Sequence, residues 1–161
     1  MTVKNSLILG LLFLVLTSCD KHRVFDRYIA VDNAWHRDSI IRFDFETQDT
    51  VTYHQLFVTL RNNKNYPFSN LFVIISMEDP DEKITVDTLE YMMAYPDGTL
   101  MGKGFSDIKE NKLFYKENFR FKKPGKYQMG IQHAVRDIGQ VEGKEILNGV
   151  QEVGFRIESK K

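Results

Sequence analysis

The residues with the most specific chemistry are Leu16-Thr17-Ser18-Cys19, which end an apolar run and contain the only cysteine of the chain. Small residues directly before a cysteine are typical of a bacterial lipoprotein processing site. Cleavage before Cys19 leaves that residue at the new N-terminus, and its thiol becomes the thioether to diacylglycerol. The sequence therefore predicts lipid attachment at Cys19, and a plain secreted protein with an incidental cysteine is the alternative.

Residues 1–18 have the layout of a secretory signal peptide, with Lys4 before the ten-residue apolar run 7–16. As a helix this run is about 15 Å long, half of the hydrocarbon thickness of a bilayer, so it is not predicted to span a membrane. One acyl chain binds a membrane marginally, whereas two or more hold it stably. A triacylated Cys19, with palmitate among its chains, would be a permanent anchor.

Residues 19–23 are predicted to be a lipidated tether that precedes a single domain at residues 24–161. Asp20 directly after the cysteine resembles the inner-membrane retention signal of enterobacteria, and an acidic cluster here can mark surface export in other bacteria. The segment Asp20-Lys21-His22-Arg23 is net basic instead, which favours the periplasmic side. We therefore expect a lipid-anchored protein of the cell envelope, at the outer membrane and facing the periplasm.

The remaining polar residues form no recognisable catalytic or metal-binding pattern. The segment Gly98–Gly104 has three residues between its first two glycines and Gly after Lys103, so it does not match a phosphate-binding loop. The four histidines lack ligand spacing, and the acidic turn residues do not match a calcium loop: these are His22, His36, His54 and His133, and Asp79, Asp81, Glu82 and Asp97. We expect His133 to be a hydrogen-bonded core residue. The sequence predicts no enzyme activity, no cofactor and no metal.

Composition describes a domain of ordinary size with a hydrophobic core. Removal of residues 1–18 leaves 143 residues with a net charge near −1, which gives no general attraction to nucleic acid. With Cys19 acylated, no disulfide can form, so stability in an oxidising compartment must come from packing. Most of the 12 Phe and 7 Tyr lie in the mature part and supply that core.

Apolar and polar residues alternate along most of the mature chain, which predicts β-strands and no long helix. Strands are expected near residues 24–31, 41–46, 56–61, 71–77, 84–93, 113–121, 127–135 and 153–157. Short turns such as Lys123-Pro124-Gly125 separate them. The pattern is typical of an all-β domain, a single antiparallel β-sandwich that is either Ig-like or jelly-roll-like.

Three segments carry more detailed expectations. Residues 71–77 are apolar at nearly every position, which predicts either a central strand covered on both faces or a strand deep in a sandwich. The apolar phase changes between Ile84 and Leu89, which predicts a bulge or bend near Asp87-Thr88. Trp35-His36 is expected in a polar loop.

Several long strings of the chain resemble the GldH family of gliding-motility lipoproteins of Bacteroidota. They are Arg61-Asn62-Asn63, Tyr66-Pro67-Phe68-Ser69-Asn70-Leu71-Phe72, Asp87-Thr88-Leu89-Glu90-Tyr91-Met92, Pro96-Asp97-Gly98, Gly102-Lys103-Gly104 and Glu110-Asn111-Lys112-Leu113-Phe114-Tyr115-Lys116, together with Cys19 and Trp35-His36. The resemblance implies an envelope lipoprotein required for gliding and connected with the type IX secretion system. It carries over Cys19 and no catalytic residue.

The function expected from this resemblance is a membrane-anchored component of the gliding motility and type IX secretion apparatus that binds other envelope proteins. Loops that mix aromatic, glycine and charged residues are the expected contact regions. The candidates are Arg61, Asn63, Tyr66, Phe68, Tyr95, Lys103 and Phe105. The alternative is a module that binds envelope glycan or peptidoglycan, which requires an exposed row of aromatics drawn from Trp35, Tyr53, Tyr66 and Tyr95.

Overall fold

The computed structural model describes residues 20–104 and 106–160, and these form ten β-strands. The strands are β1 (Arg23–Ala30), β2 (Ala34–His36), β3 (Ile41–Thr47), β4 (His54–Asn62), β5 (Asn70–Glu78), β6 (Ile84–Met92), β7 (Lys109–Phe119), β8 (Gly125–His133), β9 (Ile146–Asn148) and β10 (Val150–Ser159). The described residues contain no helix long and apolar enough to cross a membrane. The predicted signal peptide at residues 1–18 and Cys19 lie outside them.

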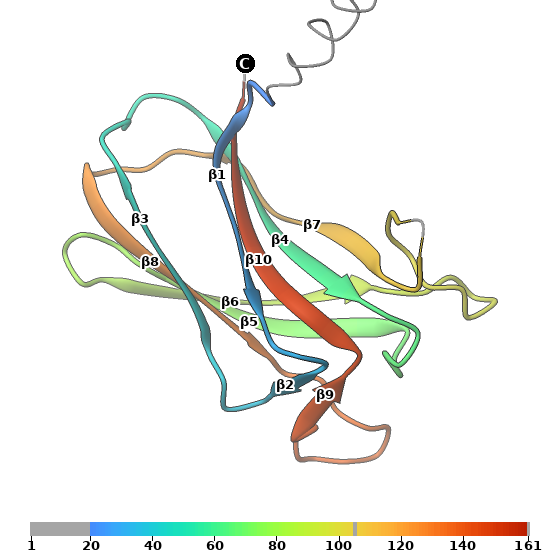
Figure 1. Ribbon diagram of the computed structural model, residues 1–161. Helices are drawn as coiled ribbons and strands as arrows, with labels where there is room; N and C mark the ends of the chain where they lie inside the picture. The colour runs from blue at the N-terminus through green and yellow to red at the C-terminus, as the bar shows by residue number, and fades with distance from the viewer. Residues whose placement is uncertain (1–19, 105, 161) are drawn as a thin grey trace, which may run out of the picture.

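The strands build two four-stranded antiparallel sheets, which Figure 1 shows as two separate layers. One sheet has the order β1-β10-β4-β7, which we call sheet A, and the other has the order β3-β8-β5-β6, which we call sheet C. Strands pair from the outside of the chain inward: β1 with β10, β2 with β9, β3 with β8, β4 with β7 and β5 with β6. This nested order is the jelly roll, so the predicted antiparallel sandwich is confirmed and its jelly-roll form is the one adopted.

The core lies between the two sheets and consists of the alternate residues that point inward from each strand. Its largest fully buried side chains are Trp35, Phe43, Phe121, Phe155, Leu56, Leu60, Leu71, Ile75, Met93, Met129, Ile131 and Leu147. Phe45 joins several aromatic neighbours, with its ring stacked on Tyr127 at 5.7 Å and tilted against Phe25 at 5.4 Å. Such pairs add directional contacts to the area they bury.

The small pairing of β2 with β9 corrects the prediction of a polar loop at Trp35-His36. Trp35 is completely buried opposite Leu147, and its indole Nε1 donates to the Ser39 carbonyl at 3.0 Å. A buried indole needs such an acceptor. The sequence concealed this arrangement because the partner strand lies more than a hundred residues further along the chain.

The structure also corrects two expectations for neighbouring strands. β5 and β6 keep one register from Glu78↔Ile84 to Asn70↔Met92, so the bulge predicted near Asp87-Thr88 is wrong. Ile84 and Val86 belong to the outer face of a regular strand and are exposed. β5 buries one face completely and leaves the other half-buried, so it is not covered completely on both faces.

The two ends of the sandwich carry different features (Figure 1). Asp20 and β1 begin beside the end of β10, where Arg156 bonds Asp20 and the Ser159 N–H donates to the His22 carbonyl at 2.8 Å. β4 runs from this end to the other over nine residues, about 30 Å. Residues 63–69, 93–104 and 106–108 lie beyond that far end, so the chain leaves toward the predicted tether on the side opposite these loops.

Gly149 holds the far end together by close backbone approach. It has a φ of +80°, and its carbonyl accepts from the Asn63 N–H at 2.8 Å. A Cβ at this position would overlap the backbone nitrogen of Tyr66. Glycine is therefore required both for the left-handed backbone and for the space.

We expect Gly149→Ala to lower the free energy of unfolding by about 3 kcal/mol, because backbone strain and overpacking add. Gly98→Ala is the matched control, since Gly98 has a φ of +84° but open space around it, and it should cost about 1 kcal/mol. Chemical denaturation followed by Trp35 fluorescence measures both. Equal losses in the two variants would contradict the close approach at Gly149.

Candidate functional site

The two loop regions that the sequence analysis selected lie side by side at the far end of the sandwich. The Met93 N–H donates to the Ser69 carbonyl at 2.7 Å, and Lys64 pairs with Asp107 at 3.6 Å. Main-chain bonds in both directions link Lys103 with Glu110, at 2.9 and 2.8 Å. Residues 63–69, 93–104 and 106–108 therefore lie together on one surface, which we call the loop end.

Arg61 lies on β4 at the base of the loop end and contacts each of the three other strands of sheet A. Its Nε donates to Glu110 on β7 at 2.9 Å, its Nη1 donates to Glu152 on β10 at 2.6 Å, and its guanidinium lies 4.2 Å from the centre of the Tyr28 ring on β1. The Glu152 hydrogen bond raises the pKa of Arg61 above its ordinary value. With these partners satisfied, Arg61 orders the loop end and leaves about a third of its side chain for contact.

The first loop is built by Asn63, Tyr66 and Phe68 in different ways. Asn63 Oδ1 accepts from the Asn65 N–H at 2.9 Å, and its Nδ2 donates to Asn33 at 2.8 Å. Tyr66 is only 4% exposed and donates its hydroxyl to the Asn70 carbonyl at 2.7 Å, and burial raises its pKa. Tyr66 therefore supports the loop from inside, which corrects its assignment as a contact residue. Phe68 packs edge-on against it at 6.3 Å and stays half-buried.

The second loop contributes the most exposed of the predicted contact residues. Tyr95 is 52% exposed, and its backbone closes a turn in which its N–H donates to the Thr99 carbonyl at 2.9 Å. Lys103 is exposed beside Glu110. Phe105 and Cys19 lie outside the described residues, so their roles stay predictions.

The aromatic row required by the glycan-binding alternative is not formed. Trp35 and Tyr66 are buried in the core. Tyr53 is 50% exposed but lies at the tether end, where its carbonyl accepts from the Lys160 N–H at 2.8 Å, and Tyr95 lies at the loop end. Two exposed rings at opposite ends of a sandwich do not make a continuous stacking row.

The acidic turn residues act locally. Asp79 Oδ1 accepts from the N–H groups of Asp81 and Lys83 at 2.9 and 3.0 Å, and Asp97 Oδ1 accepts from the Thr99 N–H at 2.9 Å. The Thr99 hydrogen bond holds the pKa of Asp97 below its usual range. Within the part of the chain that the structure describes, no three His, Cys, Asp or Glu residues gather at metal-binding distance.

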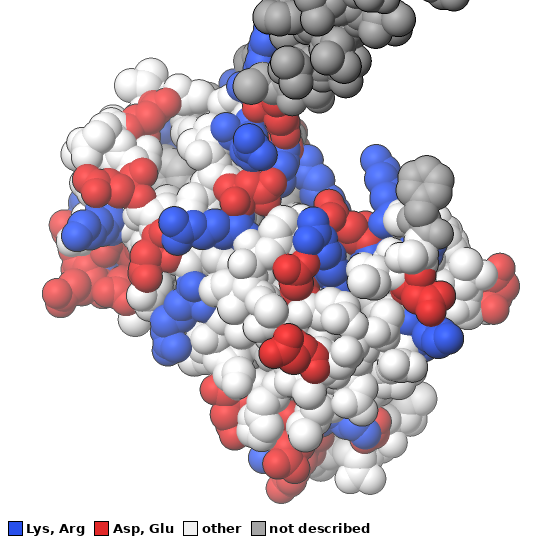
Figure 2. Space-filling model, viewed as in Figure 1, with Lys and Arg blue, Asp and Glu red and all other residues white. Residues whose placement is uncertain are grey.

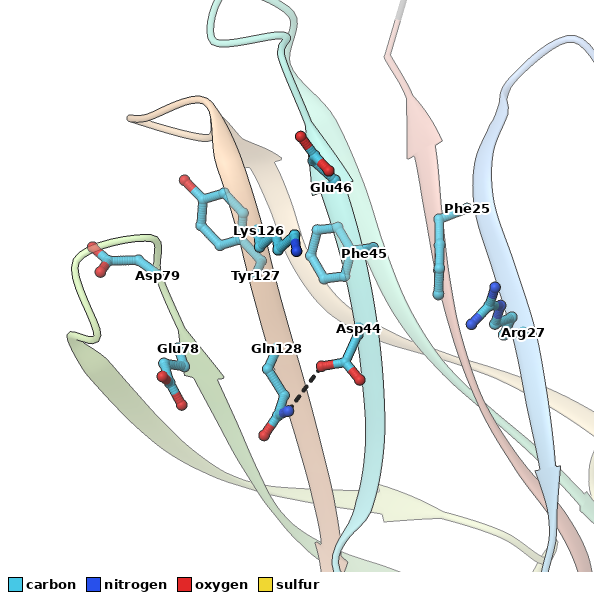
Figure 3. A pocket seen from close by; sticks show the side chains of 10 residues that line it. All are labelled: Phe25, Arg27, Asp44, Phe45, Glu46, Glu78, Asp79, Lys126, Tyr127 and Gln128. Atoms are coloured by element: carbon cyan, nitrogen blue, oxygen red, sulfur yellow. Dashed lines mark hydrogen bonds between the residues drawn. The ribbon is translucent and has the colours of Figure 1, made fainter.

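A hollow of about 780 Å³, which the sequence analysis missed, opens beside the edge strands β1 and β3 (Figure 3). Phe25, Arg27, Asp44, Phe45, Glu46, Glu78, Asp79, Lys126, Tyr127 and Gln128 line it. Its residues combine an aromatic floor with a mostly acidic rim, in which Gln128 Nε2 donates to Asp44 at 2.8 Å. These groups come from strands far apart in the sequence, so no local motif indicated the hollow.

His133 occupies the core beside Trp35, with the two rings edge-on at 5.2 Å. It is 2% exposed, as expected, but neither ring nitrogen makes a well-formed hydrogen bond within the described residues, which corrects the prediction of a hydrogen-bonded histidine. Burial lowers the pKa of His133 to about 4, and the backbone of Trp35 opposes this shift only weakly. The ring is therefore neutral in the folded protein near pH 7.

The chain is similar to known lipoproteins over most of its length. The family model described as GldH lipoprotein matches residues 23–157. A gliding motility lipoprotein GldH of Flavobacterium johnsoniae is 56% identical over 160 residues, 99% of each chain. A gliding motility lipoprotein GldH homolog of Christiangramia forsetii is 46% identical over 145 residues, 90% of this chain and 89% of its own. A solved GH115 4-O-methyl-alpha-glucuronidase shares 13% identity over 89% of this chain and 18% of its own, with a TM-score of 0.47.

The fold and the loop end define a jelly-roll domain that leads to its predicted tether at one end and exposes loops at the other. The match over most of the chain shows the family: this chain belongs to the GldH lipoprotein family, as its resemblance implied. It is a gliding-motility lipoprotein, held by lipid in the cell envelope. The relatives' names describe motility lipoproteins rather than enzymes.

We expect the stability of this domain to fall as pH drops from about 6.5 to about 4. The pKa of His133 is about 4 in the folded state and about 6.5 in an unfolded chain, so only the unfolded state gains a proton in this window. The loss reaches about 3 kcal/mol at the lower limit. Urea denaturation at several pH values measures it, and His133→Leu should flatten the slope between pH 6.5 and 4.5. An unchanged slope in that variant would contradict the assignment to His133.

Proposed function

We propose that this lipoprotein is a protein-binding subunit of the gliding machinery, working with the type IX secretion apparatus. Cys19 carries the lipid, palmitate included, and anchors the chain at the outer membrane with its domain facing the periplasm. The single observation that supports this most is the division between the two ends of the sandwich. A chain tethered through Asp20 holds the loop end about 30 Å away from its attachment, where other proteins can reach it.

The proposed contact surface is the exposed part of the loop end. Tyr95 supplies an aromatic ring, Lys103 a charge and Phe68 a half-buried apolar edge. Asn63 and Arg61 hold these groups in place through their bonds to Asn33, Glu110 and Glu152. Tyrosine and arginine are residue types enriched at protein interfaces, and Tyr95 and Arg61 supply them at the loop end.

Lipid attachment strengthens such contacts without adding affinity at the interface. A protein confined to a membrane meets other envelope proteins at a raised effective concentration. Weak contacts at the loop end are then sufficient for assembly. The glycan-binding alternative loses its main support, because Trp35 and Tyr66 are buried.

The experiment is in-cell crosslinking of the full lipidated chain followed by mass spectrometry of the recovered motility and secretion proteins. We expect Tyr95→Ala combined with Lys103→Ala to lower recovery about tenfold, because an aromatic anchor and a charge are lost together. Tyr53→Ala is the matched control, since Tyr53 is 50% exposed at the opposite end and should leave recovery unchanged. Cys19→Ala should move the protein out of the membrane fraction.

Two results would count against the proposed function. One is undiminished recovery of motility and secretion proteins from the loop-end variant while Tyr53→Ala behaves identically. The other is a Cys19→Ala protein that stays in the membrane fraction, which would remove the anchor. Circular dichroism of each variant confirms that the β-sandwich is intact before recovery is compared.

A further inference from the structure

β6 is an edge strand of sheet C, and its free side offers unpaired main-chain groups. The β5–β6 ladder is bounded by the Asp79 N–H donating to the Lys83 carbonyl at 3.0 Å and by the Met93 N–H donating to the Ser69 carbonyl at 2.7 Å. Bonded and non-bonded pairs alternate in an antiparallel ladder. The odd-numbered residues of β6 therefore bond β5, and the five even-numbered residues direct their N–H and C=O groups to the free edge. These are Ile84, Val86, Thr88, Glu90 and Met92.

The same five residues place their side chains on the outer face of sheet C. Ile84, Val86 and Met92 are 58%, 60% and 63% exposed. Beside them on β5, Phe72 and Ile74 are half-buried, opposite Glu90 and Thr88. The free edge and an exposed apolar surface thus coincide along one strand.

The other edge strands of sheets A and C carry basic residues, which β6 lacks. β1, β3 and β7 each contain Arg or Lys, as in Arg27, Arg42 and Lys112, whereas β6 contains neither. Charged residues, and lysine above all, are the usual device that prevents another strand from adding to an edge. Figure 2 shows charges of both signs interspersed over the molecule in this view. Sheet A has ion pairs of its own, among them those of Arg61 and Arg156.

The inner side of β6 is fixed, so the edge is preformed. Asp87 pairs with Lys116 at 2.8 Å and accepts from the Tyr115 hydroxyl at 2.7 Å, and Lys116 holds the pKa of Asp87 below its usual range. The Tyr91 hydroxyl donates to the Phe114 carbonyl at 2.8 Å. These contacts hold β6 against sheet A while Ile84, Val86 and Met92 stay exposed.

Charge indicates what kind of strand fits this edge. Glu78 lies opposite Ile84 at one end of the apolar row, and Glu90 precedes Met92 at the other. Glu90 accepts from Asn70 Nδ2 at 2.8 Å, and no described Lys or Arg pairs with either carboxylate. A complementary strand carries a basic residue near each end and apolar residues between them.

We infer that β6 is a docking site for an extended segment of a partner protein, which adds to sheet C as a fifth strand. Main-chain bonds to the five even-numbered residues supply the pairing, and apolar side chains at alternate positions cover Ile84, Val86 and Met92. A groove of about 630 Å³ continues this surface from Thr88 and Phe72 to Phe68 at the loop end. The inference goes beyond the proposed function, because it names a second surface and a mode of recognition.

Thr88→Pro is the variant that tests main-chain pairing at this edge most directly. The Thr88 N–H faces the free edge, so proline at this position removes a donor to the incoming strand without breaking the β5 ladder, and edge strands tolerate proline in that orientation. Thr88→Ala is the matched control, because it shortens the side chain and keeps the N–H. Val86→Lys is a second variant that places a charge in the apolar row and does not depend on backbone geometry.

The experiment uses the full lipidated chain in detergent micelles and a synthetic peptide of alternating Val and Thr with a Lys at each end. We expect the peptide to bind and to slow hydrogen exchange at the amides of Val86, Thr88 and Glu90, which exchange fast in the free protein. Thr88→Pro and Val86→Lys should weaken binding about tenfold or more, and Thr88→Ala by less than about threefold. A control peptide has the same composition but its valines grouped at one end. It should bind the unsubstituted protein about as weakly as the alternating peptide binds Thr88→Pro.

Three outcomes would overturn the inference. The alternating peptide could fail to bind, or bind equally well to Thr88→Pro and Val86→Lys. Protection of β6 that rises with protein concentration in the absence of peptide would assign the edge to a second copy of this chain. None of these outcomes bears on the loop end, so the proposed function stands or falls separately through Tyr95 and Lys103.

Discussion

The pairing of the first strand with the last is the constraint on which the rest of the molecule depends. β10 lies between β1 and β4 in sheet A, so it connects the chain's first strand to the centre of the fold. Arg156 on β10 bonds Asp20, Asp26 and Glu158, which holds the start of the domain against its end. Both chain ends therefore leave from one side of the sandwich, and the loops that remain available for binding collect on the other.

The outer face of sheet A and the β6 edge of sheet C differ in character. Across sheet A, carboxylates and cations neutralise one another, as in the contacts of Arg61 with Glu110 and Glu152 and of Lys112 with Glu158. Along β6, at the edge of sheet C, Ile84, Val86 and Met92 are exposed, and the strand contains no Lys or Arg. An ion-paired face is already satisfied by its own chain, whereas an apolar edge gains most when another chain covers it. Recognition by this domain is thus expected on one face and one end only.

The sequence predicted most of the strands, because alternation of apolar and polar residues is a local property. It could not choose between Ig-like and jelly-roll order, since that choice is made by contacts such as Trp35 with Leu147 that are remote in the chain. Tyr66 looked like a surface aromatic because its acceptor, the Asn70 carbonyl, is invisible in the pattern. Ile84 and Val86 suggested a bulge because apolar residues are read as buried, and these two are exposed.

The nested pairing also governs when the domain can form. The partner of β1 is β10, so β1 has no neighbour in sheet A until β10 is available. A chain that crosses a membrane through a narrow channel stays unfolded in transit, and this topology cannot close early on the near side. Sheet A can therefore be completed only after β10 has followed β1 through such a channel.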